Sequence, residues 1–176
     1  LMVLTAFLAP IIQTHDPLSQ ALIDRRTGTS VEYLFGTDTL GRDQFSRIVH
    51  GAKTSLYVGL LSVMIGAVIG TSVGISSAYI GGRFDLVVQR FIDALQGIPG
   101  LVLALSLVVA LGASRNNVTI AIAASFIPRM TRISRSQALS VKQEDYILAA
   151  RAIGATPLRI MFRHVLPNVM PTLLVL

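Results

Sequence analysis

A stretch of 29 residues without a charged side chain, 54–82, most constrains what this chain can fold into. About 20 apolar residues already make a helix that crosses a bilayer. A second uncharged stretch, 94–114, is again long enough to cross. Of all residues, 52% are apolar and 14% charged, which is a composition typical of membrane proteins. We therefore predict an all-α, polytopic helical membrane protein.

A third apolar stretch follows at about 116–136 and carries Arg129 and Arg132 near its end. Long basic side chains can reach the membrane border from such positions. The predicted complete spans are therefore about 54–80, 94–114 and 116–136, and Gly97-Ile98-Pro99-Gly100 should break or kink the second near its start.

Both ends of the chain are apolar. Residues 1–12 are too short to span and lack the basic flank of a signal peptide, which is the competing interpretation. We interpret 1–12 as the end of a first span and 165–176 as the start of another. The expectation is a fragment truncated at both ends.

The charges indicate an orientation. Loop 13–53 has five basic and five acidic residues, whereas the opposite side has nine basic against four acidic, counting Arg129 and Arg132. An excess of Lys and Arg marks the cytoplasmic side. Loop 13–53 is therefore predicted to be extracytoplasmic, and 83–93 and 135–163 to be cytoplasmic connections. Because the positive charge lies at membrane borders, it does not indicate nucleic-acid binding.

Loop 13–53 is predicted to end in a surface helix. Its apolar residues Phe45, Ile48, Val49, Ala52 and Leu56 recur at helical spacing. We expect this helix to lie on the membrane before the chain turns into the first complete span, and the segment 35–43 before it to form a turn-rich, ordered loop.

Small residues repeat every four positions within that span: Ser62, Gly66, Gly70, Gly74 and Ala78. This spacing lines one helix face and lets another helix approach closely. The partner is either another subunit or another part of this chain.

No catalytic, metal or cofactor site is predicted. The segment 51–54 lacks the earlier glycine of a phosphate-binding loop, because position 46 is Ser46. The three histidines are isolated, and no nucleophile is paired with a base. The chain is predicted not to be an enzyme.

The segment 141–163 is predicted to form two short helices broken at Gly154. Glycine suits the left-handed position that ends a helix, and Thr156 followed by Pro157 suits the start of the next. The segment is basic and joined directly to apolar sequence. A soluble partner could dock on such an element.

Ala149-Ala150, three residues, Gly154, and then Leu166-Pro167 resemble the cytoplasmic signature loop of permease subunits in binding-protein-dependent ABC importers. Leu148 stands where the pattern usually has an acidic residue, and His164 where it usually has isoleucine. His164 is normal for the dipeptide, oligopeptide and nickel branch. The segments 35–38 and 40–43 also resemble that branch, and the resemblance covers essentially the whole chain.

The resemblance implies a type I ABC importer permease fold in a bacterial or archaeal plasma membrane. It implies a pathway for peptides or a related small solute, with two cytoplasmic ATPase subunits, a second permease and an extracytoplasmic binding protein as partners. The residues that it assigns to ATPase coupling are Asp145, Ala149, Ala150, Arg151, Gly154, Pro157, Arg163 and Pro167. The alternatives are a secondary transporter and a non-transporting membrane anchor.

Overall fold

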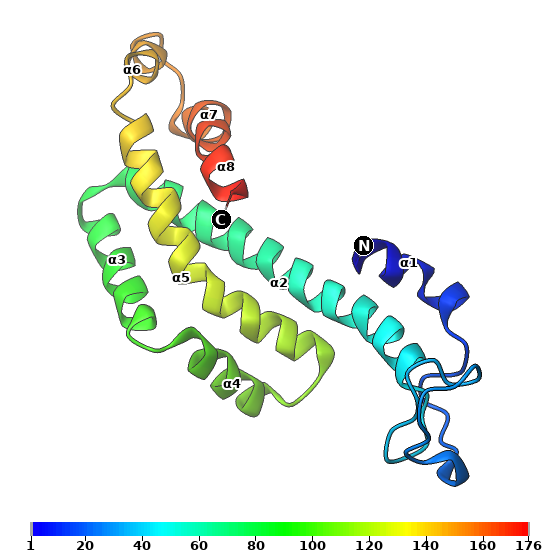
Figure 1. Cartoon of the computed structure of the whole chain (residues 1–176). Helices are drawn as coiled ribbons and strands as arrows, with labels where there is room; N and C mark the ends of the chain where they lie inside the picture. Colours follow the sequence, from blue (N-terminus) through cyan, green and yellow to red (C-terminus); the bar gives the residue numbers. More distant parts are fainter. Residues whose placement is uncertain (1, 176) are drawn as a thin grey trace. The chain divides into compact units, whose positions relative to one another are not determined.

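The structure is a computed structural model that describes residues 2–175, without the side chains of residues 2 and 4–7. Leu1 and Leu176, at the ends of the two expected partial spans, lie outside the described residues. The helices are α1 (Met2–Ile12), η1 (Leu22–Asp24), α2 (Gln44–Ile80), α3 (Gly82–Gln96), α4 (Gly100–Leu111), α5 (Arg115–Val141), α6 (Asp145–Ala152), α7 (Pro157–Ile160), η2 (Met161–Val165) and α8 (Leu166–Leu174) (Figure 1). The described residues contain no named strand, so the all-α prediction is confirmed.

The chain divides into two compact units, residues up to 60 and residues from 61 onward. The first unit contains α1, the loop 13–43 and the beginning of α2. The second contains the rest of α2 and all later helices.

Loop 13–43 is an ordered structure held by polar contacts, as predicted for its segment 35–43. Asp43 is buried and accepts hydrogen bonds from the backbone N–H groups of Phe45 and Ser46, both at 3.2 Å, so it caps the start of α2. It also accepts from the hydroxyls of Ser46 at 2.6 Å and Thr14 at 2.8 Å. In turn, Ser46 Oγ accepts from the N–H groups of Thr14 and His15, both at 3.1 Å.

The prediction of a separate surface helix before the first span is wrong. Residues 44–80 form one continuous helix of 37 residues, and the predicted boundary between 53 and 54 lies inside it. The segment contains no proline, and Gly51 keeps the helical conformation, so nothing interrupts the backbone hydrogen bonds. At 1.5 Å per residue the helix is about 55 Å long, well beyond the hydrocarbon thickness of a bilayer.

The predicted connection 83–93 is helical instead. It belongs to α3, which meets α4 at a bend of 87°. The predicted break near Gly97 and Pro99 is confirmed, because proline lacks the N–H that would continue the helix and also disfavours helical geometry before it. The predicted span 94–114 is consequently not one straight helix.

Among the described residues, α2 alone is a single helix long and apolar enough to cross a membrane. The bent pair of α3 and α4 passes the same criterion when it is taken together. The third predicted span coincides with α5, which has 27 residues but is too polar to meet the criterion, because it carries four arginines and many hydroxyl and amide side chains.

Small residues of α2 lie directly against α5, and the two helices run parallel (Figure 1). Ser62 Oγ donates to the Thr119 carbonyl at 2.9 Å, and a Cβ atom added to Gly70 would lie 2.6 Å from Met130 Cβ. A side chain there would force the helices apart. The four-residue repeat that sequence analysis left open therefore packs within this chain, and Ser62 and Ala78, at its two ends, are buried.

Candidate functional site

The predicted break at Gly154 is a complete helix-ending motif. Gly154 has φ +81°, its N–H donates to the Arg151 carbonyl at 2.9 Å, and the N–H of Ala155 donates to the Ala150 carbonyl at 3.0 Å. These two bonds satisfy carbonyls that the end of α6 would otherwise leave unpaired. A residue with a side chain is disfavoured at this φ, so the break depends on glycine.

Helix α7 starts as its sequence predicts. Thr156 has an extended conformation, and its side chain accepts a long hydrogen bond of 3.4 Å from the N–H of Arg159. Pro157 occupies the first helical position, where its missing N–H costs nothing.

The second helix does not end at residue 163, where sequence analysis ended the coupling loop. It continues through the π-helical turn η2 into α8, so the predicted start of the next span at 165 lies inside a continuous helical segment. Pro167 explains the wider turn, because its ring would clash with the carbonyl four residues earlier in a regular α-helix. In η2, the Leu166 N–H bonds to the Met161 carbonyl.

Residues 145–165, called here the two-helix element, are anchored by a cluster of apolar side chains. Ile147 and Ile160 have no exposed surface, and Ala150 is 7% exposed. Together with Val165 of the element, they pack in one cluster with residues of α2, α5 and α8: Ile75, Ala78, Ala138 and Val169. Each fully buried isoleucine stabilises by about 1.5–3 kcal/mol relative to exposure in water, so the element is firmly held on this side.

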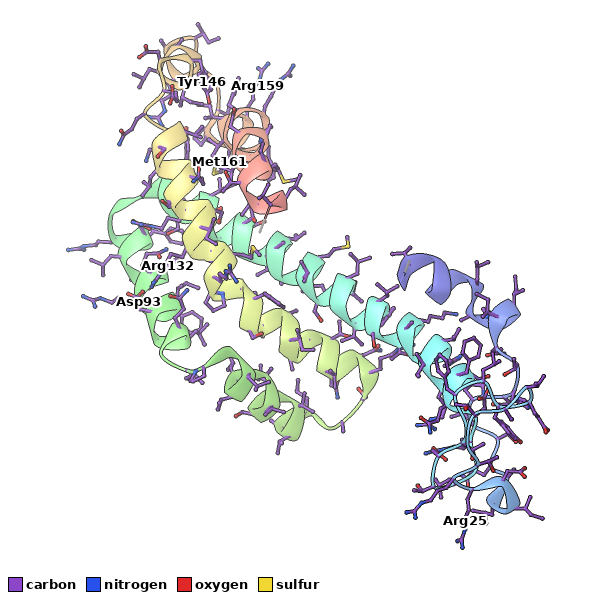
Figure 2. All side chains as sticks on the ribbon, in the orientation of Figure 1. Arg25, Asp93, Arg132, Tyr146, Arg159 and Met161 are labelled. Atoms are coloured by element: carbon purple, nitrogen blue, oxygen red, sulfur yellow. The ribbon has the colours of Figure 1, made fainter. Side chains whose placement is uncertain are left out.

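The opposite face of the element exposes large apolar side chains. Ile153 is 86% exposed and Tyr146 43%, whereas Leu158 and Phe162 lie on the side of α2, where they line a hollow with Ile75. A hollow of about 450 Å³ lies between the arms of the element, and Arg159 and Arg163 are among its lining residues. Figure 2 labels Tyr146 on α6 and Arg159 on α7, which are both lining residues. Exposed apolar surface with a polar rim is typical of a protein–protein contact.

The eight residues predicted for coupling do not all gather at this hollow. Four of them line it: Ala149, Ala150, Gly154 and Arg163. Three others are exposed elsewhere along the helices: Asp145, Pro157 and Pro167. The eighth, Arg151, is exposed and lies with Cζ 5.3 Å from the centre of the Tyr79 ring.

Ala149 and Ala150 lie in different environments. Ala149 is exposed, whereas Ala150 packs against the chain's own apolar cluster. Of the two alanines that the resemblance assigns to ATPase coupling, Ala150 therefore packs mainly within this chain.

Sequence analysis missed the ion pairs between α3 and α5. The basic residues nearest to Asp85 and Asp93 in the sequence are Arg83 and Arg90. In the structure, Asp85 pairs with Arg135 and accepts from Ser77, while Asp93 pairs with Arg132 (Figure 2). These pairs join α3 to α5 over large separations in sequence. Only a pattern between distant segments could have predicted them.

Within the described residues, no group of three or more His, Cys, Asp or Glu side chains could hold a metal ion. The surface instead offers apolar side chains, a shallow hollow and guanidinium groups, which together suit a partner whose surface is apolar with acidic positions.

Comparison with known proteins places this geometry in a family. Residues 66–176 match the family described as binding-protein-dependent transport system inner membrane component. A putative peptide transport system permease of Brucella suis and a probable D,D-dipeptide transport system permease of Escherichia coli K12 are each 41% identical over 175 residues. A glutathione transport system permease of Pectobacterium atrosepticum is 38% identical over 176 residues.

Each of these alignments covers 99% of this chain. The chain spans 59% of the length of the Brucella suis and Escherichia coli relatives and 58% of the Pectobacterium one. The family match includes the whole two-helix element and the glycine positions of α2 that pack on α5. The chain belongs to the family of binding-protein-dependent transport system inner membrane components.

Proposed function

We propose that the complete protein is the permease subunit of an ATP-driven importer in the plasma membrane of a bacterium or archaeon. Its helices form part of a multi-pass pathway for peptides or a related small solute. Relatives at 38–41% identity are named peptide, D,D-dipeptide and glutathione transport permeases, which supports this class of cargo. ATP is hydrolysed by partner subunits and not by this chain.

The two-helix element is the proposed docking site for a cytoplasmic ATPase subunit. The observation that carries this is its division into two faces, with Ile147 and Ile160 fully buried and Ile153 largely exposed beside the hollow. A short helix laid in a groove of the partner buries such a face. The complete importer would contain two ATPase subunits, a second permease and an extracytoplasmic binding protein.

Nucleotide-driven closure of the ATPases would move the element and, through it, the spans. The firm attachment of the element to α2 and α5 supports this transmission, because a rigid-body movement requires that the moved parts stay packed together.

Substitution of Ile153 by Glu tests the docking proposal. Position 153 is exposed, so the change should leave protein abundance unaltered, but it should place an unpaired carboxylate in the ATPase contact and cost at least tenfold in association. The measurement is co-purification of the ATPase subunits together with substrate uptake by the complete importer.

Val31→Glu is the matched control, because Val31 is fully exposed but belongs to the first unit. It should keep ATPase association at the parental level. Parental association and uptake in Ile153→Glu would refute docking through this face.

A further inference from the structure

One aromatic ring connects the two-helix element with the end of α2. Tyr79 is half-buried next to the apolar cluster and is the penultimate residue of α2. Arg151, in the last turn of α6, lies with Cζ 5.3 Å from the centre of this ring. Lys142, which follows α5, has its Nζ 5.6 Å from the same centre. Both distances are within the range in which a cation is attracted to a ring face.

Lys142 is fixed by further bonds to the same end of α2. Its Nζ donates to the carbonyls of Ala78 at 3.0 Å and Tyr79 at 2.9 Å. These carbonyls belong to the last turn of the helix, where a positive charge is favourable. Lys142 therefore holds the end of α5 to the end of α2, and Tyr79 lies where both helices meet the element.

The contact between Arg151 and Tyr79 differs in kind from the apolar cluster. Packing among aliphatic side chains is not directional, so it holds α6 close without fixing how the helix is turned. A guanidinium group over an aromatic face requires a defined position of both partners. Because Arg151 is exposed on α6, it moves with whatever moves that helix.

We propose that Tyr79 is a positioning residue that transmits displacement of α6 to α2 through its contacts with Arg151 and Lys142. This inference rests on the proposed function, since it concerns how docking at the two-helix element reaches the spans. The apolar cluster holds α6 against α2, and the contacts of the Tyr79 ring fix the orientation of α6. Loss of the ring face should therefore uncouple ATP hydrolysis from uptake without releasing the ATPase.

The test compares Tyr79→Phe with Tyr79→Leu in the complete importer, reconstituted with its ATPase subunits and binding protein. Phenylalanine keeps the ring face, and leucine keeps apolar bulk without it. We expect parental behaviour from Tyr79→Phe. For Tyr79→Leu we expect parental abundance and ATPase association, with a loss of about fivefold in solute transported per ATP hydrolysed. A parental ratio in Tyr79→Leu would overturn the proposal.

Variants of Arg151, the exposed partner of Tyr79, keep the test decisive if the Tyr79→Leu protein does not accumulate in the membrane. Arg151→Gln removes the cation, and Arg151→Lys restores it. The amount of solute transported per ATP hydrolysed should fall in Arg151→Gln and stay at the parental level in Arg151→Lys. Combining Tyr79→Leu with Arg151→Gln should lower the ratio no further than either change alone, because both remove the same contact. Additive losses would overturn the relay.

The outcomes separate this inference from the proposed function. If the parental protein fails to bind ATPase subunits, the proposed function is wrong. If it binds them and the Tyr79 and Arg151 variants keep the parental ratio, only the relay is wrong.

Discussion

Loop 13–43 and the two-helix element 145–165 are both ordered segments between longer helices, but they are held in opposite ways. Apart from Pro17, the buried side chains of the loop and its junction with α2 are polar: Thr37, Asp43 and Ser46. Those of the element are apolar: Ile147, Ala150, Ile160 and Val165. The loop depends on hydrogen-bond geometry and ionisation, whereas the element depends on packing.

Because of this difference, the two regions should respond to different perturbations. Hydrogen bonds to a carboxylate require that it stay ionised, so the loop is sensitive to acid. Apolar packing does not respond to pH. The angle between α6 and α7, however, is set by the backbone at Gly154, and this angle determines where the exposed side chains of the element lie. Each of the following changes should affect one region and leave the other intact.

The largest expected effect is that of Gly154→Val. Gly154 has φ +81°, and no atom lies within 4 Å of where a Cβ would be added, so any effect comes from the backbone and not from a clash. A β-branched residue is strongly disfavoured at that φ. Uptake should fall to background at unchanged protein abundance, while loop 13–43 keeps its resistance to protease.

Gly154→Asn is the matched control, because asparagine tolerates left-handed backbone better than other residues with side chains. It should retain a substantial part of the uptake. Equal uptake in the valine variant and the parent would show that the angle between α6 and α7 does not matter for transport.

A smaller effect is expected from Asp43→Ala in the loop. The substitution removes the cap of α2 and the acceptor for Thr14, at a cost of about 1–2 kcal/mol. Protease should cut loop 13–43 faster, and the two-helix element should keep its ATPase association. Glu32→Gln, at an exposed position, is the control and should leave the cutting rate unchanged.

The same carboxylate predicts a pH dependence. Burial by itself raises the pKa of Asp43, but hydrogen bonds from Ser46, Thr14 and Phe45 outweigh it and hold the pKa below the ordinary value. The stabilisation is therefore complete above the unfolded pKa of about 3.9 and is lost as pH falls through the lower pKa of the folded state. Cutting of the loop should accelerate on acidification in the parent and change less in Asp43→Ala.

The sequence predicted those features that depend on neighbouring residues. The break at Gly154, the start at Thr156 and Pro157, and the interruption near Pro99 each follow from local backbone chemistry, and all three are present. The four-residue repeat of α2 predicted a close helix contact but not its partner, because nothing in the repeat specifies α5.

The features that were missed depend on residues far apart in the chain. The pairing of Asp85 with Arg135 and the contact of Tyr79 with Arg151 arise only when α2, α3, α5 and α6 are assembled. Residues 44–53 were expected to form a surface helix because apolar residues recur there at helical spacing before the change to uncharged sequence at 54. Backbone hydrogen bonding continues through that change, since neither proline nor a left-handed glycine interrupts it.

Cross-linking from position 153 tests the central claim most directly, namely that the exposed face of the two-helix element contacts an ATPase subunit. A photoreactive amino acid would replace Ile153 in the complete importer, and Val31 in a parallel sample, because both side chains are largely or fully exposed. The account predicts an adduct with the ATPase from position 153 and none from position 31. Absence of an ATPase adduct at 153, or equal adducts from both positions, would contradict it.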